Sequence, residues 1–263
     1  MATKKQERDR LRRRHEKQLA AATKKAADRA RLRIIATIVG VIVVLCLVLW
    51  WAGSTFSEVT PGRTVTTAGC EAPPKSLGTS AELTLPDKAA VAGKTFEATL
   101  TTNCGDIVLS LDAEKAPQAV ASFVQLAEAD YWLNSPCHRV VRSTQMTLLQ
   151  CGDPTGSGQG TPGYGFGVEN APADGVYERG VVAMARTPDP EKGNGGQFFL
   201  VDGKTTIQDP DGYSVFGTVT SGLDIVDKII AAGVAGGAEQ TDGAPNAPIS
   251  ILRVAVTEKK AQP

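Results

Sequence analysis

The chain has 263 residues, which allows one or two domains, and its 28 Lys and Arg residues balance 28 Asp and Glu residues. Of the 2 histidines, only His138 lies beyond the first 33 residues, which excludes a zinc site with two histidines in that part. The neutral total hides an uneven distribution. Residues 1–33 hold 13 Lys/Arg and 4 Asp/Glu, a net charge of +9, so the remainder carries −9.

An uncharged apolar stretch follows the basic residues directly. Residues 34–52 run for 19 residues, close to the ~20 needed for a transmembrane helix, and Trp50 and Trp51 lie at the far end. Because basic residues flank only the near end, we predict a single-pass anchor with a cytoplasmic N-terminus and an extracytoplasmic C-terminal part. A cleaved signal peptide is the alternative, but its apolar region is shorter and ends in small residues.

The basic residues 1–33 have two possible interpretations. They are typical of an arm that binds nucleic acid, and equally of a cytoplasmic tail that sets topology and contacts anionic lipid. The adjacent span makes the second reading more economical, so we expect membrane lipid and no nucleic acid as a partner.

Residues 53–93 are rich in Gly, Ser, Thr, Pro and Ala and show no sustained hydrophobic period, which predicts an extracytoplasmic linker. The pattern changes at residue 94. Thr95–Asn103 and Asp106–Asp112 alternate apolar and polar residues around Gly105, as in a β-hairpin. Pro117 then opens an amphipathic helix of about four turns. Its apolar residues recur at helical spacing: Val120, Phe123, Val124, Ala127 and Tyr131.

Short apolar runs predict further strands at His138–Arg142, Met146–Cys151, Gly180–Ala185, Gln197–Val201 and Ser214–Val219. A second helix is predicted from an N-cap at Ser221 to Gly233, followed by a last strand at Ile249–Thr257. We therefore predict a mostly β fold, a closed antiparallel barrel of about eight strands capped by two α-helices, after a transmembrane helix. This domain is assigned to residues 94–258, and residues 259–263 form a C-terminal tail.

Several catalytic motifs are missing from the sequence. No Gly-x-Ser-x-Gly supports a hydrolase, no Gly-x-x-x-x-Gly-Lys supports phosphate binding, and no Cys-x-x-Cys supports zinc. The glycine-rich residues 156–160 follow a predicted strand but do not open a helix, which argues against a dinucleotide site. We expect neither a metal nor a cofactor.

Four ordered blocks in residues 94–258 stand out instead. Residues 137–141 read Cys-His-Arg-Val-Val, and residues 150–153 read Gln-Cys-Gly-Asp. Residues 193–199 read Gly-Asn-Gly-Gly-Gln-Phe-Phe, and residues 215–217 read Val-Phe-Gly. In this order they resemble the Phe-His-Arg-Ile-Ile, Gln-Gly-Gly-Asp, Asn-Gly-Ser-Gln-Phe-Phe and Val-Phe-Gly sequences of the cyclophilin family of peptidyl-prolyl cis-trans isomerases. One block alone is weak, but four in order are highly specific.

The resemblance implies catalysis of X-Pro isomerisation (rotamase activity). It assigns to Arg139 the donation of a hydrogen bond toward the prolyl nitrogen, and to Gln150 the orientation of Arg139 and contact with the substrate backbone. Phe199 is implied as the floor of the proline pocket and Gln197 as a polar wall. Without the resemblance, we would interpret Arg139 as one partner of a surface ion pair and Phe199 as a residue of the barrel core. His138 is interpreted as a partly buried structural histidine.

The pocket departs from the family pattern on the side of Gln150. Ten residues separate Arg139 from Gln150, three more than is usual, so the hairpin between them is expected to be longer. Thr147 stands where the family commonly has phenylalanine and Leu148 where it has methionine. The pocket therefore loses an aromatic wall unless Met146 fills the gap.

Further departures lie across the pocket. Arg186 stands where an asparagine acts through its backbone, and Ser214 stands where some members have histidine. Residues 207–212 lack a tryptophan that many members have there, and Pro210 is expected to supply the apolar edge; Asn194 completes the predicted substrate-binding set. Cyclosporin binding in the family depends on that tryptophan, so the resemblance implies weak cyclosporin binding and reduced isomerase efficiency.

Four cysteines follow the predicted span: Cys70, Cys104, Cys137 and Cys151. An even number in an oxidising compartment allows two disulfides in three pairings. Because Arg139 and Gln150 are expected on neighbouring strands of one hairpin, the cysteines beside them should lie close together. We predict the pairs Cys137–Cys151 and Cys70–Cys104.

These observations lead to one expected function and one alternative. We expect a membrane-anchored isomerase of the cell envelope that acts on proline-containing segments of exported proteins. The alternative is a non-catalytic module or chaperone that binds such segments on the same scaffold. The thinned pocket favours the alternative, whereas the presence of Arg139, Gln150 and Phe199 disfavours it.

Overall fold

The computed structural model describes residues 68–74 and 78–259, so the predicted basic tail and transmembrane span lie outside the described residues. Within the described ranges, no helix is long and apolar enough to cross a membrane. The helices are η1 (Lys88–Val91), α2 (Pro117–Glu128) and α3 (Leu223–Ala232). The strands are β1 (Thr95–Thr102), β2 (Gly105–Leu111), β3 (Ser135–Pro136), β4 (Arg139–Arg142), β5 (Thr147–Cys151), β6 (Val176–Tyr177), β7 (Val181–Arg186), β8 (Asn194–Val201), β9 (Thr205–Thr206), β10 (Val215–Ser221), β11 (Asp242–Gly243) and β12 (Ser250–Lys259).

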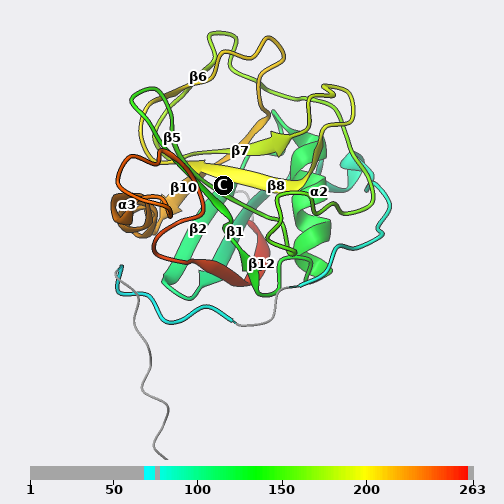
Figure 1. Cartoon of the computed structure of the whole chain (residues 1–263). Coiled ribbons are helices and arrows are strands. Elements are labelled where there is room, and N and C mark those ends of the chain that lie inside the picture. Colours follow the sequence, from blue (N-terminus) through cyan, green and yellow to red (C-terminus); the bar gives the residue numbers. More distant parts are fainter. Residues whose placement is uncertain (1–67, 75–77, 260–263) are drawn as a thin grey trace, which may run out of the picture. The chain divides into compact units, whose positions relative to one another are not determined.

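One curled antiparallel sheet of 10 strands carries the fold, in the order β11-β4-β5-β8-β7-β10-β2-β1-β12-β3 (Figure 1). The prediction of a closed barrel is wrong, because the ladder is open between β11 and β3. Strand β11 pairs with the outer edge of β4. In a closed barrel, β3 or β12 would have to pair with that edge instead. The sheet is therefore a half-barrel, and β3 runs into β4 through Cys137 and His138.

The period-2 alternation of the strands divides their side chains between two apolar clusters. In β8, Phe198 and Leu200 point into the main core, whereas Phe199 and Val201 point to the opposite face. The same alternation separates Leu149 from Leu148 in β5. The smaller outer cluster is thus a second apolar surface on the outside of the half-barrel.

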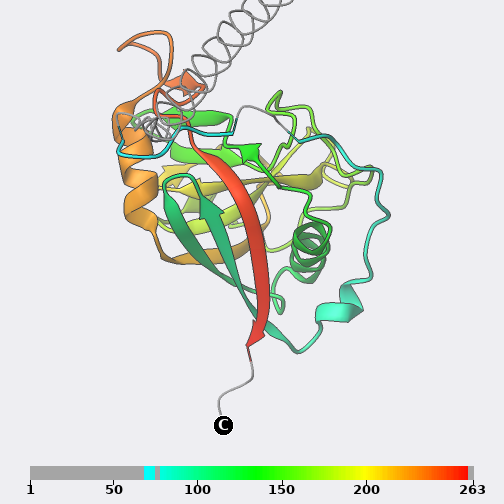
Figure 2. The same ribbon diagram turned by 90° about the horizontal axis from the view of Figure 1, so that it is seen from below.

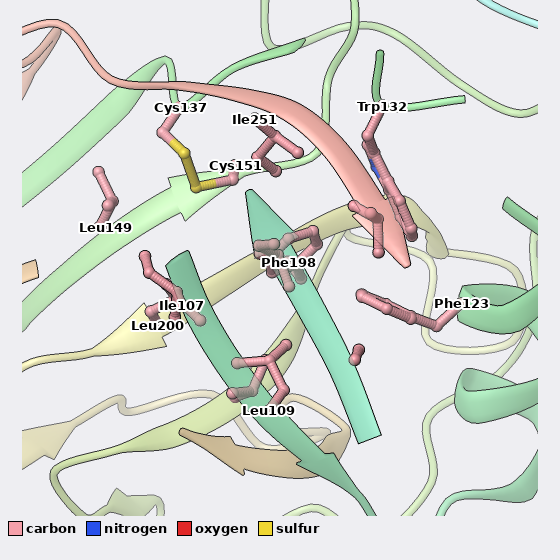
Figure 3. Close-up of a cluster of buried hydrophobic side chains, with 14 of the residues drawn as sticks. Ile107, Leu109, Phe123, Trp132, Cys137, Leu149, Cys151, Phe198, Leu200 and Ile251 are labelled. Carbon is pink, nitrogen blue, oxygen red and sulfur yellow. A yellow bond between two sulfur atoms is a disulfide. The ribbon is translucent and has the colours of Figure 1, made fainter. Parts of the chain in front are cut away.

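Aromatic rings fill the main core between α2 and the sheet (Figure 3). The ring of Phe123 lies 4.6 Å from Trp132 and 5.7 Å from Phe198, measured between centroids. The buried indole nitrogen of Trp132 donates to the carbonyl oxygens of Gly152 and Gly196 at 3.3 and 3.0 Å. Trp132 therefore ties the end of β5 to β8 and fixes the two strands that carry much of the candidate site.

Both helices pack against the main core, at opposite ends of the curled sheet (Figure 1). Helix α2 begins at Pro117 as predicted, and the carboxylate of Glu169 accepts hydrogen bonds from the backbone N–H groups of Gln118 and Ala119. Helix α3 does not begin at the predicted N-cap, because Ser221 is the last residue of β10. Its N-cap is Gly222, where φ is 83° and a Cβ would lie 2.4 Å from the oxygen of Asp106.

Part of the predicted linker packs against the domain, as the cyan segment of Figure 2 shows along α2. The backbone N–H of Leu83 donates to the oxygen of Pro162 at 2.8 Å. Side-chain amides on α2 donate to the carbonyl oxygens of Thr84 and Pro86. The Cys70–Cys104 disulfide, one of the two predicted pairs, joins this segment to the β1–β2 hairpin.

Candidate active site

The outer apolar cluster forms the floor of the candidate site. Antiparallel register places Gln150 of β5 opposite Phe199 of β8, and Phe199 opposite Ala183 of β7. Leu148 precedes Gln150 by two residues, so its side chain lies on the same face of the sheet. Phe199 is 3% exposed although it is outside the main core, because Tyr177 and Tyr213 pack against its ring at centroid distances of 6.1 and 5.8 Å.

A chain of polar side chains crosses three strands beside this floor. Arg139 of β4 lies opposite Gln150 of β5, and its Nη1 donates to Oε1 of Gln150 at 3.0 Å. The Gln150 amide in turn donates to Oε1 of Gln197 at 3.0 Å. Gln197 donates to the carbonyl oxygens of Gly158 and Gly160 at 3.1 and 3.3 Å. Each amide therefore accepts on one side and donates on the other, which fixes its orientation.

An acidic partner of Arg139 comes from a distant part of the chain. Nε and Nη2 of Arg139 donate to the two carboxylate oxygens of Asp242, each at 2.7 Å. This fork holds the pKa of Asp242 below its ordinary value, and the same hydrogen bonds raise the pKa of Arg139. No sequence motif marks Asp242, which lies 103 residues from Arg139.

A pocket of about 180 Å³ lies over the floor and beside the guanidinium. Its walls combine the Arg139–Gln150 pair with apolar and aromatic side chains: Arg139, Met146, Leu148, Gln150, Ala185, Arg186, Phe199, Ile207 and Tyr213. A second hollow of about 210 Å³ shares Gln150, Ala185 and Arg186 with it and is also lined by Asn194 and Gln197. The two hollows are therefore adjacent, the first with most of the apolar side chains and the second with more polar groups, and together they are called the groove.

Comparison with known proteins bears on this groove. The family model for cyclophilin type peptidyl-prolyl cis-trans isomerase/CLD matches residues 97–256, more than half of the chain. The chain belongs to the cyclophilin family. The resemblance of the four sequence blocks is thus confirmed at the level of the family.

Two curated relatives and one solved structure show how far the similarity extends. A probable peptidyl-prolyl cis-trans isomerase B of Mycobacterium tuberculosis is 36% identical over 203 residues, covering 71% of this chain and 63% of the relative. The protein of that name from Mycobacterium leprae is 37% identical over 185 residues, covering 63% and 60%. The chain therefore spans less than two thirds of these relatives. A Cryptosporidium parvum cyclophilin crystallised in the presence of the dipeptide Ala-Pro is 25% identical with a TM-score of 0.50, covering 62% of this chain and 99% of that chain.

The pocket and the adjoining hollow contain most of the side chains predicted from the sequence. Arg139, Gln150 and Phe199 surround the pocket together with Leu148, and Met146 lines it as well. Asn194 and Gln197 lie in the adjoining hollow. Thr147 does not line either hollow. It lies on the other face of β5 from Leu148, where its N–H bonds the hydroxyl of Thr205, so Met146 supplies the wall expected there.

Two further predicted pocket residues lie outside it. Ser214 is fully buried, and its hydroxyl accepts hydrogen bonds from the Glu169 N–H and the Asn194 side chain. The neighbouring Tyr213 lines the pocket in its place. Pro210 is exposed, and the apolar edge expected from it comes from Ile207. Side chains alternate between the two faces of a strand, so alternation along residues 213–215 was the sequence signal that could have identified Tyr213 as a pocket residue.

Arg186 contributes its side chain and not only its backbone to the pocket wall. Its side chain is 3% exposed, and Nη2 donates to the carboxylate of Asp209 at 2.6 Å. Its Nε donates to the oxygen of Gly212 at 2.8 Å, and the guanidinium lies 5.1 Å from the ring centroid of Tyr213. Arg186 thus fixes the loop and the aromatic ring that bound the apolar end of the groove.

The second predicted disulfide lies directly behind the site. Cys137 and Cys151 are bonded, which joins the residues next to β4 and at the end of β5 (Figure 3). Arg139 and Gln150 are two and one residues from these cysteines. Within the described residues, no group of three or more His, Cys, Asp or Glu side chains is arranged to hold a metal ion.

His138, between the disulfide and Arg139, gives the domain a testable pH dependence. Burial lowers the pKa of His138 below its ordinary value, Arg139 lowers it further, and Asp153 opposes both effects. The folded state therefore binds this proton more weakly than the unfolded chain, so stability present above about pH 6.5 is lost as the pH falls. When the pH is lowered from 7.5 to 5, we expect the Tm of the wild type to fall relative to the Tm of the His138→Gln variant. A growing advantage of the wild type on acidification would mean that Asp153 dominates.

Proposed function

We propose that this protein is a peptidyl-prolyl cis-trans isomerase that acts on X-Pro bonds of exported proteins. The observation that carries the proposal is that Arg139 and Phe199 bound the same pocket, so that a charged donor faces an apolar hollow. The names of the mycobacterial relatives support the activity, and the Ala-Pro dipeptide present with the Cryptosporidium protein supports the substrate class.

The chemistry needs little beyond this arrangement. Rotation about the X-Pro bond has a barrier of ~18–20 kcal/mol, because twisting removes the conjugation of the nitrogen lone pair with the carbonyl. A catalyst has to stabilise the twisted amide more than the planar one. A fixed hydrogen-bond donor aimed at the nitrogen lone pair does so without a nucleophile or a proton transfer.

The proposed roles follow from position in the groove. Phe199, Leu148, Met146 and Tyr213 hold the prolyl ring by apolar contact. Arg139 donates to the prolyl nitrogen as the bond twists, and Gln150 orients Arg139 and contacts the substrate backbone. Gln197 and Asn194 contact the substrate segment beside the proline in the adjoining hollow.

We also propose that the domain is extracytoplasmic and anchored by residues 34–52, with residues 1–33 in the cytoplasm against anionic lipid. The charge asymmetry of the sequence supports this topology. The two disulfides also support it, because disulfides persist in oxidising compartments. Weak cyclosporin binding is part of the proposal, since Ile207 and not tryptophan supplies the apolar edge.

The test uses the full chain in a mild detergent. We expect catalytic amounts to increase the cis–trans exchange rate of an Ala-Pro peptide, measured by NMR exchange spectroscopy, in proportion to protein concentration. The same peptide with Ala in place of Pro is the control for binding that does not involve proline. Saturable peptide binding without faster exchange would contradict the enzymatic proposal and support the non-catalytic binding module.

A further inference from the structure

The guanidinium of Arg139 is held mainly by a residue outside the pocket. Of three hydrogen bonds between its side chain and other side chains, two go to Asp242 at 2.7 Å and one goes to Gln150 at 3.0 Å. An arginine side chain has many rotamers, and this one is 41% exposed, so apolar packing does not immobilise it. Asp242 therefore provides most of the restraint on where the donor points.

The segment that carries Asp242 is itself well supported. Asp242 and Gly243 form β11, opposite Val141 and Val140 of β4, and the N–H of Arg142 donates to the oxygen of Thr241 at 2.7 Å. Farther along the segment after α3, the N–H of Ala235 donates to the oxygen of Ala244 at 2.7 Å. Asp242 is thus attached to the same strand as Arg139, which keeps carboxylate and guanidinium in one frame.

The hydrogen-bond count shows what the pair leaves for a substrate. A guanidinium has five N–H donors in a fixed plane. Asp242 takes the Nε–H and one on Nη2, and Gln150 takes one on Nη1. Among the residues that the structure describes, no acceptor takes the second N–H of either terminal nitrogen. The fork to Asp242 fixes the plane of the group, and it therefore fixes the directions of these two donors.

We propose that Asp242 is a positioning residue, which orients the donor of Arg139 for isomerisation of the X-Pro bond; the inference rests on the proposed function. A carboxylate also reduces the positive potential at the pocket, which opposes catalysis. Both side chains are accessible, 41% for Arg139 and 51% for Asp242, so solvent screens that effect. Loss of orientation is then the larger consequence of removing Asp242.

The experiment measures kcat and KM of the full chain for an Ala-Pro peptide in Asp242→Ala, Asp242→Asn and Asp242→Glu. We expect Asp242→Ala to lower kcat about tenfold with KM little changed, since small misplacement of a catalytic group is costly. The kcat of Asp242→Asn, which keeps one acceptor oxygen, should lie between those of Asp242→Ala and the wild type. Asp242→Glu keeps the carboxylate and should recover part of the wild-type kcat. The ¹H–¹⁵N signal of the Arg139 Nε–H, assigned by its absence in Arg139→Ala, should shift upfield and broaden in Asp242→Ala.

Asp227→Ala is the matched control, because Asp227 forms a similar fork with Arg179, at 2.8 and 3.0 Å, outside the groove. It should leave kcat unchanged. If Arg139→Ala is inactive while Asp242→Ala keeps or exceeds the wild-type kcat, the positioning role is overturned and the proposed function stands. If the wild type itself does not accelerate exchange, both are overturned. An unshifted Arg139 signal in Asp242→Ala also overturns the positioning role, whatever the variant's stability.

Discussion

Replacing Arg139 by alanine is expected to lower kcat/KM for X-Pro peptides about 10²–10³-fold, the cost typical of removing one preorganised donor from a developing charge. The alanine variant keeps the apolar floor but leaves Gln150 without the donor that it orients. Exchange spectroscopy on an Ala-Pro peptide measures the effect. Peptide affinity should change less than the rate, since the donor acts mainly on the twisted amide.

Two control variants separate this effect from loss of charge or stability. Arg139→Lys keeps the charge but cannot form the fork to Asp242 and the bond to Gln150 together, so most of the rate should still be lost. Arg179→Ala removes an arginine that forms ion pairs outside the groove and should keep the wild-type rate. A wild-type rate in Arg139→Ala would refute the proposed chemistry.

Removing the Cys137–Cys151 disulfide should lower both the stability of the domain and its isomerase rate. The bond encloses a loop with a sequence separation of 14, for which loop entropy predicts a loss of about 3 kcal/mol in the free energy of unfolding. The paired substitution of both cysteines by serine should lower the Tm by roughly 6–12 °C, measured by scanning calorimetry. Because the bond clamps β4 and β5, the rate should fall as well.

The Cys70–Cys104 pair provides the comparison for the disulfide prediction. It encloses a longer loop, with a sequence separation of 34, so loop entropy predicts a loss of stability at least as large. It joins the N-terminal segment to the β1–β2 hairpin, away from Arg139 and Gln150. We expect the rate of the folded protein to persist without it. An equal loss of rate in both paired variants would show that the Cys137–Cys151 bond has no specific effect on the site.

The sequence was informative wherever a structure depends on local periodicity. Alternation in residues 95–112 predicted the hairpin, and helical spacing after Pro117 predicted α2; both are confirmed. The Cys137–Cys151 pair also followed from the expected hairpin between Arg139 and Gln150, which left Cys70 to pair with Cys104, and both pairs are confirmed. These features depend on neighbours close in the chain, where the side-chain period is 2 or 3.6 residues.

Local pattern failed where long-range pairing decides the outcome. Strand β11 has two residues and no periodicity, yet it occupies the edge of β4 and opens the predicted barrel. The register between β10 and β7 shifts between Val215 and Gly217, and an irregularity of this kind changes which side chains face outward.

The sequence alone was therefore sufficient to predict the family, the two helices, most strands and the presence of Arg139, Gln150 and Phe199 around one pocket. These features depend on short motifs and on periodic burial, which involve residues close together in the chain. Only the tertiary structure decided which acid meets Arg139, which residues complete the pocket, and where the sheet stays open. Asp242 is 103 residues from Arg139, and nothing in its own neighbourhood distinguishes it from other surface acids. Its contact exists because β11 pairs with β4, and such pairing depends on how the whole chain buries its apolar surface.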